Sequence, residues 1–124
     1  MSYDNFDHVY LGIKLFHEGR FHEAHEEIEK FWRNYHEADR CLYQAFIQIC
    51  ACLHLIDEKR YTGAKKVLER ARNNIFQNEA TDKSQTQNLN QLSELKKCID
   101  LEKIFLDTEA LLNEHLGVYI NFTP

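Results

Sequence analysis

The sequence predicts an all-α protein, a single-domain bundle of five or six helices that spans residues 1–124 around a buried central helix. Helix breakers are nearly absent, since the only proline is the terminal residue and there are four glycines. Apolar residues recur at three- and four-residue intervals, which is typical of helices, rather than in alternation. A chain of 124 residues buries roughly two thirds of its unfolded surface and can fold as one domain.

Two helices are expected first. The apolar spacing predicts a helix over about residues 4–17, capped by Asp4 or Asn5 and ended by Gly19 in a left-handed conformation. A second helix over residues 21–32, FHEAHEEIEKFW, follows at once. Helices joined by so short a connection lie antiparallel or nearly so.

The third helix is expected at the centre of the bundle. The run LYQAFIQICACLHLI, residues 42–56, is apolar around almost its whole circumference, and such a helix is buried on all sides. Gln44 and Gln48 share one face of it, and His54 lies on another. A buried amide without a hydrogen-bond partner costs about 1–3 kcal/mol. We therefore expect both glutamines to have partners.

The rest of the chain predicts up to three further helices. An amphipathic pattern over residues 57–75 precedes a polar stretch at residues 78–88, which we expect to be a mobile loop. A short helix resumes within residues 89–99, and Asp100 caps a last helix that Gly117 ends. The apolar C-terminal segment VYINFTP is expected to dock on the body of the protein or on a partner.

Composition narrows the classes of partner. The net charge of −5 and the pI of about 5.8 give no overall basic field that would attract nucleic acid or an anionic membrane, although a local basic patch is compatible with them. The N-terminus lacks a secretory pattern, and no apolar run reaches the ~18 residues of a membrane span. We expect a cytoplasmic protein with no nucleic-acid or membrane partner. The four cysteines lack Cys-x-x-Cys spacing and are expected to be reduced residues of the core.

The second helix carries the side chains that could form a site. His25 and Glu29 lie four residues apart at the edge of its apolar stripe, so they can touch. We expect them to contact Gln44 and Gln48 in an interhelical cluster, which we name the polar seam. The candidate binding residues are His25, Glu26, Glu29, Trp32, Gln44, Gln48 and His54.

Metal binding and acid–base catalysis are weaker alternatives. A zincin helix needs His-Glu-x-x-His, but Glu29 stands at the fifth position, and the Glu-x-x-His pairs of a di-iron site are absent. The candidate metal ligands are His22, His25, Glu26 and Glu29. Imidazole and carboxylate could also act as an acid–base pair, yet no nucleophile accompanies them. The sequence thus assigns no catalytic residue and no cofactor, and a polar network that fixes helix register is the simplest interpretation.

The segment from Phe21 to Trp32 resembles a family signature. An aromatic residue followed by Glu-Ala-His-Glu-x-x-Glu-x-x-Trp is similar to the pattern of domain-of-unknown-function family 309, small helical proteins of bacteria and archaea. The likeness continues through Gly12-Ile13, Leu15-Phe16, Gly19, Gln44 to Gln48, His54, Gly63-Ala64 and Ile99-Asp100-Leu101, and departs at Ala45 and Cys98, where the family usually has glycine. The resemblance implies a helical bundle and the same candidate positions, but no established reaction. Some members are labelled metal-dependent hydrolases.

Three functions are therefore weighed. The favoured one is a small binding or interaction module whose polar seam fixes register or receives a small polar ligand, with a solvent-reachable cavity beside Trp32. The first alternative is a metal-dependent hydrolase that uses His25, Glu26 and Glu29, with His54 as a further candidate. The second is a helical scaffold for protein contact or self-association through VYINFTP. The identity of a ligand or partner is not encoded in any motif of the sequence.

Overall fold

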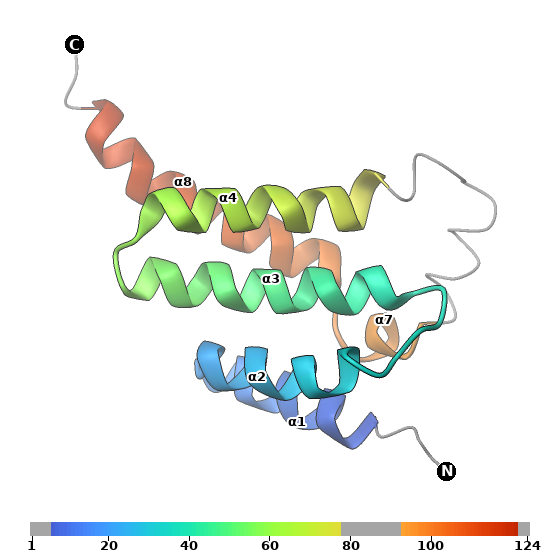
Figure 1. Cartoon of the computed structure of the whole chain (residues 1–124). Helices are drawn as coiled ribbons and strands as arrows, with labels where there is room; N and C mark the ends of the chain where they lie inside the picture. Colours follow the sequence, from blue (N-terminus) through green and yellow to red (C-terminus); the bar gives the residue numbers. More distant parts are fainter. Residues whose placement is uncertain (1–5, 78–92, 122–124) are drawn as a thin grey trace.

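The protein is an all-α bundle, as predicted. The computed structural model describes residues 6–77 and 93–121 (Figure 1). Within these residues there is no strand. The elements are α1 (Phe6–His17), α2 (Phe21–Trp32), α3 (Arg40–Asp57), α4 (Tyr61–Arg72), a π-helical turn (Asn73–Gln77), α7 (Glu94–Cys98) and α8 (Leu101–Asn121).

Helix α3 is the centre of the bundle. It lies between the α1–α2 hairpin on one side and α4 on the other, with α8 packed behind (Figure 1). Ten of its eighteen residues are buried, so the predicted central helix is confirmed. The largest fully buried side chains include Tyr43 and Phe46 of α3 and Phe105 of α8. The core therefore joins segments that are far apart in the sequence.

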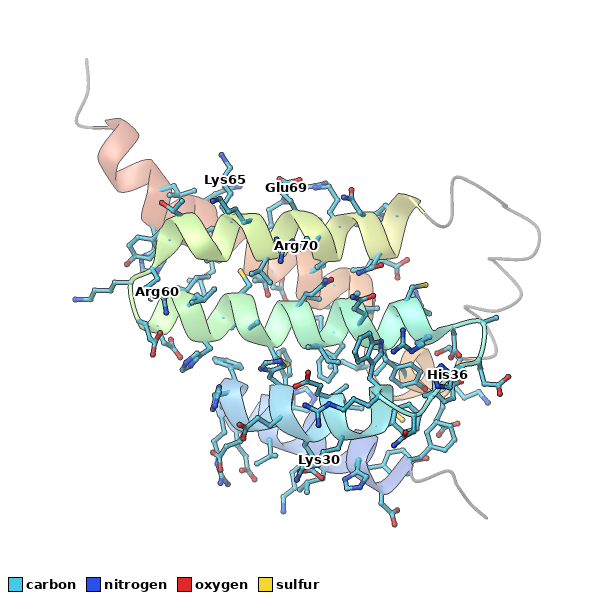
Figure 2. The ribbon with its side chains drawn as sticks, viewed as in Figure 1. Lys30, His36, Arg60, Lys65, Glu69 and Arg70 are labelled. Atoms are coloured by element: carbon cyan, nitrogen blue, oxygen red, sulfur yellow. The ribbon has the colours of Figure 1, made fainter. Side chains whose placement is uncertain are left out.

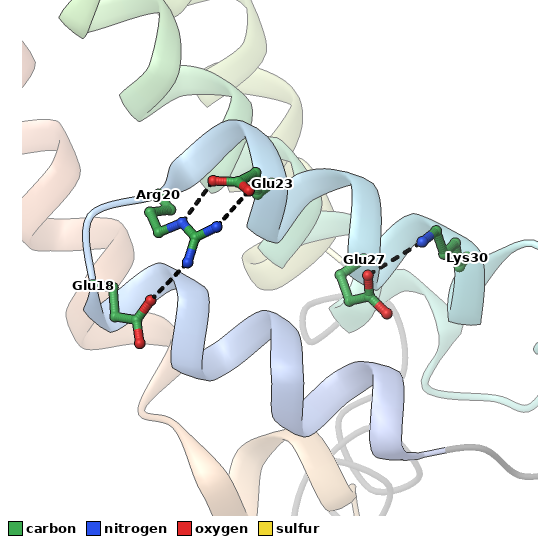
Figure 3. A network of polar contacts seen from close by, with 5 residues as sticks. All are labelled: Glu18, Arg20, Glu23, Glu27 and Lys30. Carbon is green, nitrogen blue, oxygen red and sulfur yellow. Dashed lines mark hydrogen bonds and ion pairs between the residues drawn. The ribbon is translucent and has the colours of Figure 1, made fainter.

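The α1–α2 hairpin is held by a tight turn and close helix contact. Gly19 has φ +80°, the left-handed conformation predicted for it. Side chains of the turn then form ion pairs: Arg20 donates from Nε and Nη2 to the two carboxylate oxygens of Glu23, each at 2.6 Å, and from Nη1 to Glu18 at 3.2 Å (Figure 3). The predicted cap at Asp4 or Asn5 lies outside the described residues.

The C-terminal half differs from the prediction at its end. Helix α8 runs through Gly117 to Asn121, so the predicted stop is wrong. A single helical glycine costs about 1 kcal/mol relative to alanine, which is too little to end a helix of 21 residues. The cap at Asp100 is confirmed, because its Oδ1 accepts a hydrogen bond from the Lys103 N–H at 3.2 Å. The expected loop at residues 78–88 and the side chains of VYINFTP lie outside the described part.

The cysteines divide by position. All four are free, and Cys50 and Cys52 are buried in α3 as expected. Cys98 is exposed at the end of α7, so its assignment to the core is wrong. Burial raises the pKa of the Cys50 and Cys52 thiols, that of Cys52 to about 12.

Among the described helices, none combines the length and apolarity that crossing a bilayer would require.

Candidate functional site

Three histidines meet where α2 packs on α3. The ring centroid of His22 lies 5.0 Å from that of His54 and 6.2 Å from that of His25. We refer to these three residues as the histidine cluster. His54 extends the polar edge of α2 onto α3, although the sequence suggested the glutamines for that place.

Each histidine of the cluster faces a glutamate one turn further along its own helix. The expected contact between His25 Nε2 and Glu29 Oε1 is present at 3.7 Å. His22 approaches Glu26 at 3.3 Å, and His54 of α3 approaches Glu58 at the same distance. Burial lowers the pKa of His25, and this effect outweighs the opposite effect of Glu29. The neutral imidazole is therefore the favoured form of His25 at pH 7.

Gln48 has its partner on the other side of α3. Its Oε1 accepts a hydrogen bond from Asn74 Nδ2, in the π-helical turn, at 2.8 Å. The expected contact with α2 is therefore wrong for Gln48, because six residues of helix rotate its direction by about 120° from that of His54. The half-buried Gln44 amide makes no hydrogen bond within the described residues and remains accessible to water.

The Arg40 guanidinium covers a face of the Trp32 ring. The guanidinium carbon of Arg40 lies 3.8 Å from the centroid of the Trp32 ring, and Arg40 Nε donates to the Trp32 carbonyl at 3.3 Å. Its indole Nε1 is buried without a hydrogen-bond partner in the part of the chain that is described. Trp32 lines none of the three cavities at the start of α8, at the α3–α4 turn and beside Tyr35, and the cavity expected beside it stays a prediction.

The candidate metal ligands do not converge on one point. In residues 6–77 and 93–121, no group of three His, Cys, Asp or Glu side chains is arranged to hold a metal ion. Glu26 is exposed and lies beside His22, whereas Glu29 lies beside His25 and is also approached by Arg33 at 3.6 Å. The carboxylates thus pair with separate histidines instead of sharing a centre.

A cavity of about 560 Å³ lies elsewhere, between the end of the α1–α2 hairpin, the C-terminal half of α3 and the start of α8. We refer to it as the α8 cavity. Its walls are mainly apolar, and polar groups stand among them. The apolar lining residues are Phe16, Phe21, Leu53, Ile99, Ile104 and Leu111, and the polar ones are His17, Cys98, Asp100, Lys103, Asp107 and Thr108.

The polar groups of the α8 cavity are partly committed to one another. Lys103 Nζ pairs with Asp107 Oδ2 at 2.8 Å, which raises the pKa of Lys103. The Thr108 hydroxyl donates to the carbonyl of Ile104 at 2.7 Å. The cavity lining contains two carboxylates, Asp100 and Asp107, and one lysine, Lys103. The lining therefore has a formal charge of −1 when His17 is neutral.

The sequence did not predict this cavity because its lining comes from α1, α2, α3, α7, the α7–α8 connection and α8. No motif links such segments. The one signal near it was the predicted cap at Asp100, whose carboxylate lies both at the start of α8 and in the cavity wall.

Comparison with known proteins gives one match. No curated protein and no solved structure matches the chain. A family model does match residues 9–67, which include α2 and α3 with the histidine cluster and exclude α8. Over this segment, just under half of the chain, the resemblance drawn from the sequence is confirmed, and the matching model is that of Domain of unknown function (DUF309).

Proposed function

We propose that the protein is a binding module for a small amphipathic molecule with an apolar body and a protonated amine, held in the α8 cavity. The observation that carries the proposal is the cavity itself, about 560 Å³ with a mainly apolar lining. Sites for small molecules commonly have volumes of about 300–1,000 Å³ and combine apolar walls with a few polar groups that orient the ligand.

The negative charge of the cavity lining favours a ligand that carries a protonated amine. Lys103 is already paired with Asp107, whereas within the described residues the Asp100 carboxylate accepts one hydrogen bond, at Oδ1 from a backbone N–H, and otherwise acts on Lys103 through its charge. Its second oxygen is free to accept a hydrogen bond from a ligand. An ammonium group beside it makes a charge-assisted hydrogen bond, while a ligand carboxylate meets two like charges.

Cys98 supplies a direct readout of binding. It is exposed and lines the cavity, whereas Cys50 and Cys52 are buried. Octylamine, octanoate and butylamine serve as probes, and alkylation of Cys98 by iodoacetamide is followed by mass spectrometry. We expect octylamine to slow alkylation most, because it alone has both the apolar chain and the cation. Equal protection by octanoate, or none by octylamine, would contradict the proposal.

A matched pair of variants tests the role of Asp100. Asparagine is as good a helix cap as aspartate, so Asp100→Asn removes the charge and preserves the start of α8. We expect it to weaken octylamine binding by about ten- to a hundredfold, in line with the loss of one charged hydrogen bond worth about 1.5–3 kcal/mol. Asp7→Asn, at an exposed carboxylate of α1 outside the cavity, should leave binding unchanged.

The two alternatives have less support. A metal-dependent hydrolase needs ligand side chains that converge, and such a group is missing among the described residues. A scaffold needs a continuous apolar surface, but the large exposed apolar side chains are Tyr10 and Leu11 of α1 and Leu106 and Leu111 of α8. The histidine cluster is best interpreted as a polar contact that holds α2 against α3.

A further inference from the structure

Basic residues are concentrated in one short segment of this acidic protein. Residues 59–72, which comprise α4 and the turn before it, contain six of the fifteen Lys and Arg residues and one of the twenty Asp and Glu residues. Their formal charge is +5 in a chain of net charge −5. The local field of α4 is therefore opposite in sign to that of the rest of the chain.

Most of these cations have no partner among the residues that the structure describes. Arg60 is paired with Glu58, and Arg72 with Glu69 and Glu109. No ion pair or side-chain hydrogen bond engages the other four in the described residues, namely Lys59, Lys65, Lys66 and Arg70. On the α1–α2 hairpin, Arg20 and Lys30 are both paired with glutamates (Figure 3), and Lys14 is the cation that has no ion pair among the described residues.

The unpaired cations face away from the bundle. Ala64, Leu68 and Ala71 are buried against α3 and fix the inner side of α4. Lys65, Lys66 and Arg70 are exposed. Figure 2 shows Lys65 and Glu69 on the edge of α4 that is turned away from α3, with Arg70 on the side facing the viewer. Helix α4 also lies on the opposite side of α3 from the α1–α2 hairpin (Figure 1).

A solvated helix face normally mixes the two signs of charge. Oppositely charged residues four apart stabilise a helix by about 0.2–0.5 kcal/mol, and like charges destabilise it by similar amounts. The outer face of α4 places Lys65, Lys66 and Arg70 within two turns, with Glu69 as the only carboxylate of the helix. An anionic partner would remove this repulsion, and no carboxylate of the described residues pairs with these three cations.

We propose that the outer face of α4, formed by Lys65, Lys66 and Arg70, docks an acidic segment of a partner protein. Glu69 lies on the same face, four residues after Lys65, and a continuous phosphate backbone would be repelled by it. A protein segment can place a basic or neutral residue opposite Glu69 and carboxylates opposite the lysines. None of the exposed side chains of α4 is aromatic, so none offers a platform on which a base could stack.

The experiment uses the full chain and a fluorescein-labelled helical peptide of glutamate and alanine, with binding followed by anisotropy at low and physiological ionic strength. We expect Lys65→Glu/Lys66→Glu to weaken binding about tenfold, because each exposed ion pair contributes modestly and reversal replaces attraction by repulsion. Added salt should weaken the binding of the wild type, since salt screens exposed charges over about 8–10 Å.

The control reverses two unpaired cations elsewhere. Lys14→Glu/Lys97→Glu makes the same change in net charge on α1 and α7, where both lysines are exposed. Lys14 precedes Glu18 by four residues, as Lys65 precedes Glu69, so each double variant places one new glutamate four residues before an existing one. Peptide affinity within about twofold of the wild type in this control supports the proposal. Equal weakening in both variants would overturn it, as would tighter binding to duplex DNA or to phosphatidylserine vesicles than to the peptide.

Discussion

His25 shows how burial and a neighbouring carboxylate compete over one imidazole. Glu29 lies 3.7 Å away and favours the protonated form. Loss of water favours the neutral form, and it is the larger effect, so the pKa of His25 falls below its usual value of 6.5. A contact that resembles a salt bridge by distance is therefore mainly a contact between a neutral imidazole and a carboxylate at pH 7.

This lowered pKa predicts how stability depends on pH. Because the unfolded chain binds a proton at His25 more readily than the folded protein, the stabilising contribution is full above about pH 6.5 and is lost as the pH falls toward the folded pKa. We expect the free energy of unfolding to decrease less steeply in His25→Gln than in the wild type as the pH falls from about 6.5 to the folded pKa of His25. Urea unfolding at several pH values between these limits measures the difference. His36→Gln, at an exposed imidazole, is the control. An NMR titration that places the pKa of His25 at or above 6.5 would show that Glu29 dominates instead.

At the scale of elements, the close packing of α1 on α2 requires a residue without a side chain at position 12, which is glycine. A Cβ atom at Gly12 would lie 2.5 Å from Cγ1 and Cδ1 of Ile28, whereas a Cβ at Gly63 of α4 would lie 3.6 Å from Leu55 Cδ1. The first distance is far inside van der Waals contact and the second is ordinary. Both glycines lie within helices, so replacing either by alanine gains the same helix propensity. A difference in stability between the two variants therefore reports the clash in packing.

Gly12→Ala is accordingly expected to destabilise the protein by about 1–3 kcal/mol, the usual cost of overpacking a core. Ile28 is fully buried and cannot move away freely. Gly63→Ala should instead stabilise the protein by up to about 1 kcal/mol, because alanine favours the helix. Thermal or urea unfolding of both variants measures the difference. Equal stability of the two would mean that α1 and α2 shift apart at little cost.

The helices could be predicted from the sequence because each rests on a local pattern. The apolar circumference of residues 42–56 and the glycine at position 19 are such patterns, and both predictions are confirmed. The partner of Gln48 could not be predicted, because Asn74 lies 26 residues away and meets it only through tertiary packing. The α8 cavity was missed for the same reason, since its lining depends on how distant segments meet.

At the scale of the whole molecule, α8 completes a core that the family match does not include. The match ends at residue 67, yet Leu101, Phe105 and Leu112 of α8 are almost fully buried. The Phe105 ring meets Phe76 at 5.5 Å between centroids, and the guanidinium carbon of Arg72 lies 5.1 Å from its centroid. The hairpins and α8 therefore share one core.

Two adjacent residues of α8 test this shared core. Phe105 is fully buried and Leu106 is 55% exposed, so their alanine variants differ in burial while sharing the same helix. We expect Phe105→Ala to lower the free energy of unfolding by about 3–5 kcal/mol, from lost apolar transfer and the cavity left behind. Leu106→Ala should change it by no more than about 0.5 kcal/mol. If α8 were only loosely attached, both variants would unfold α8 alone, and hydrogen exchange in α3 would stay as slow as in the wild type. Faster exchange throughout α3 in Phe105→Ala is the result expected if α8 and the central helix unfold as one unit.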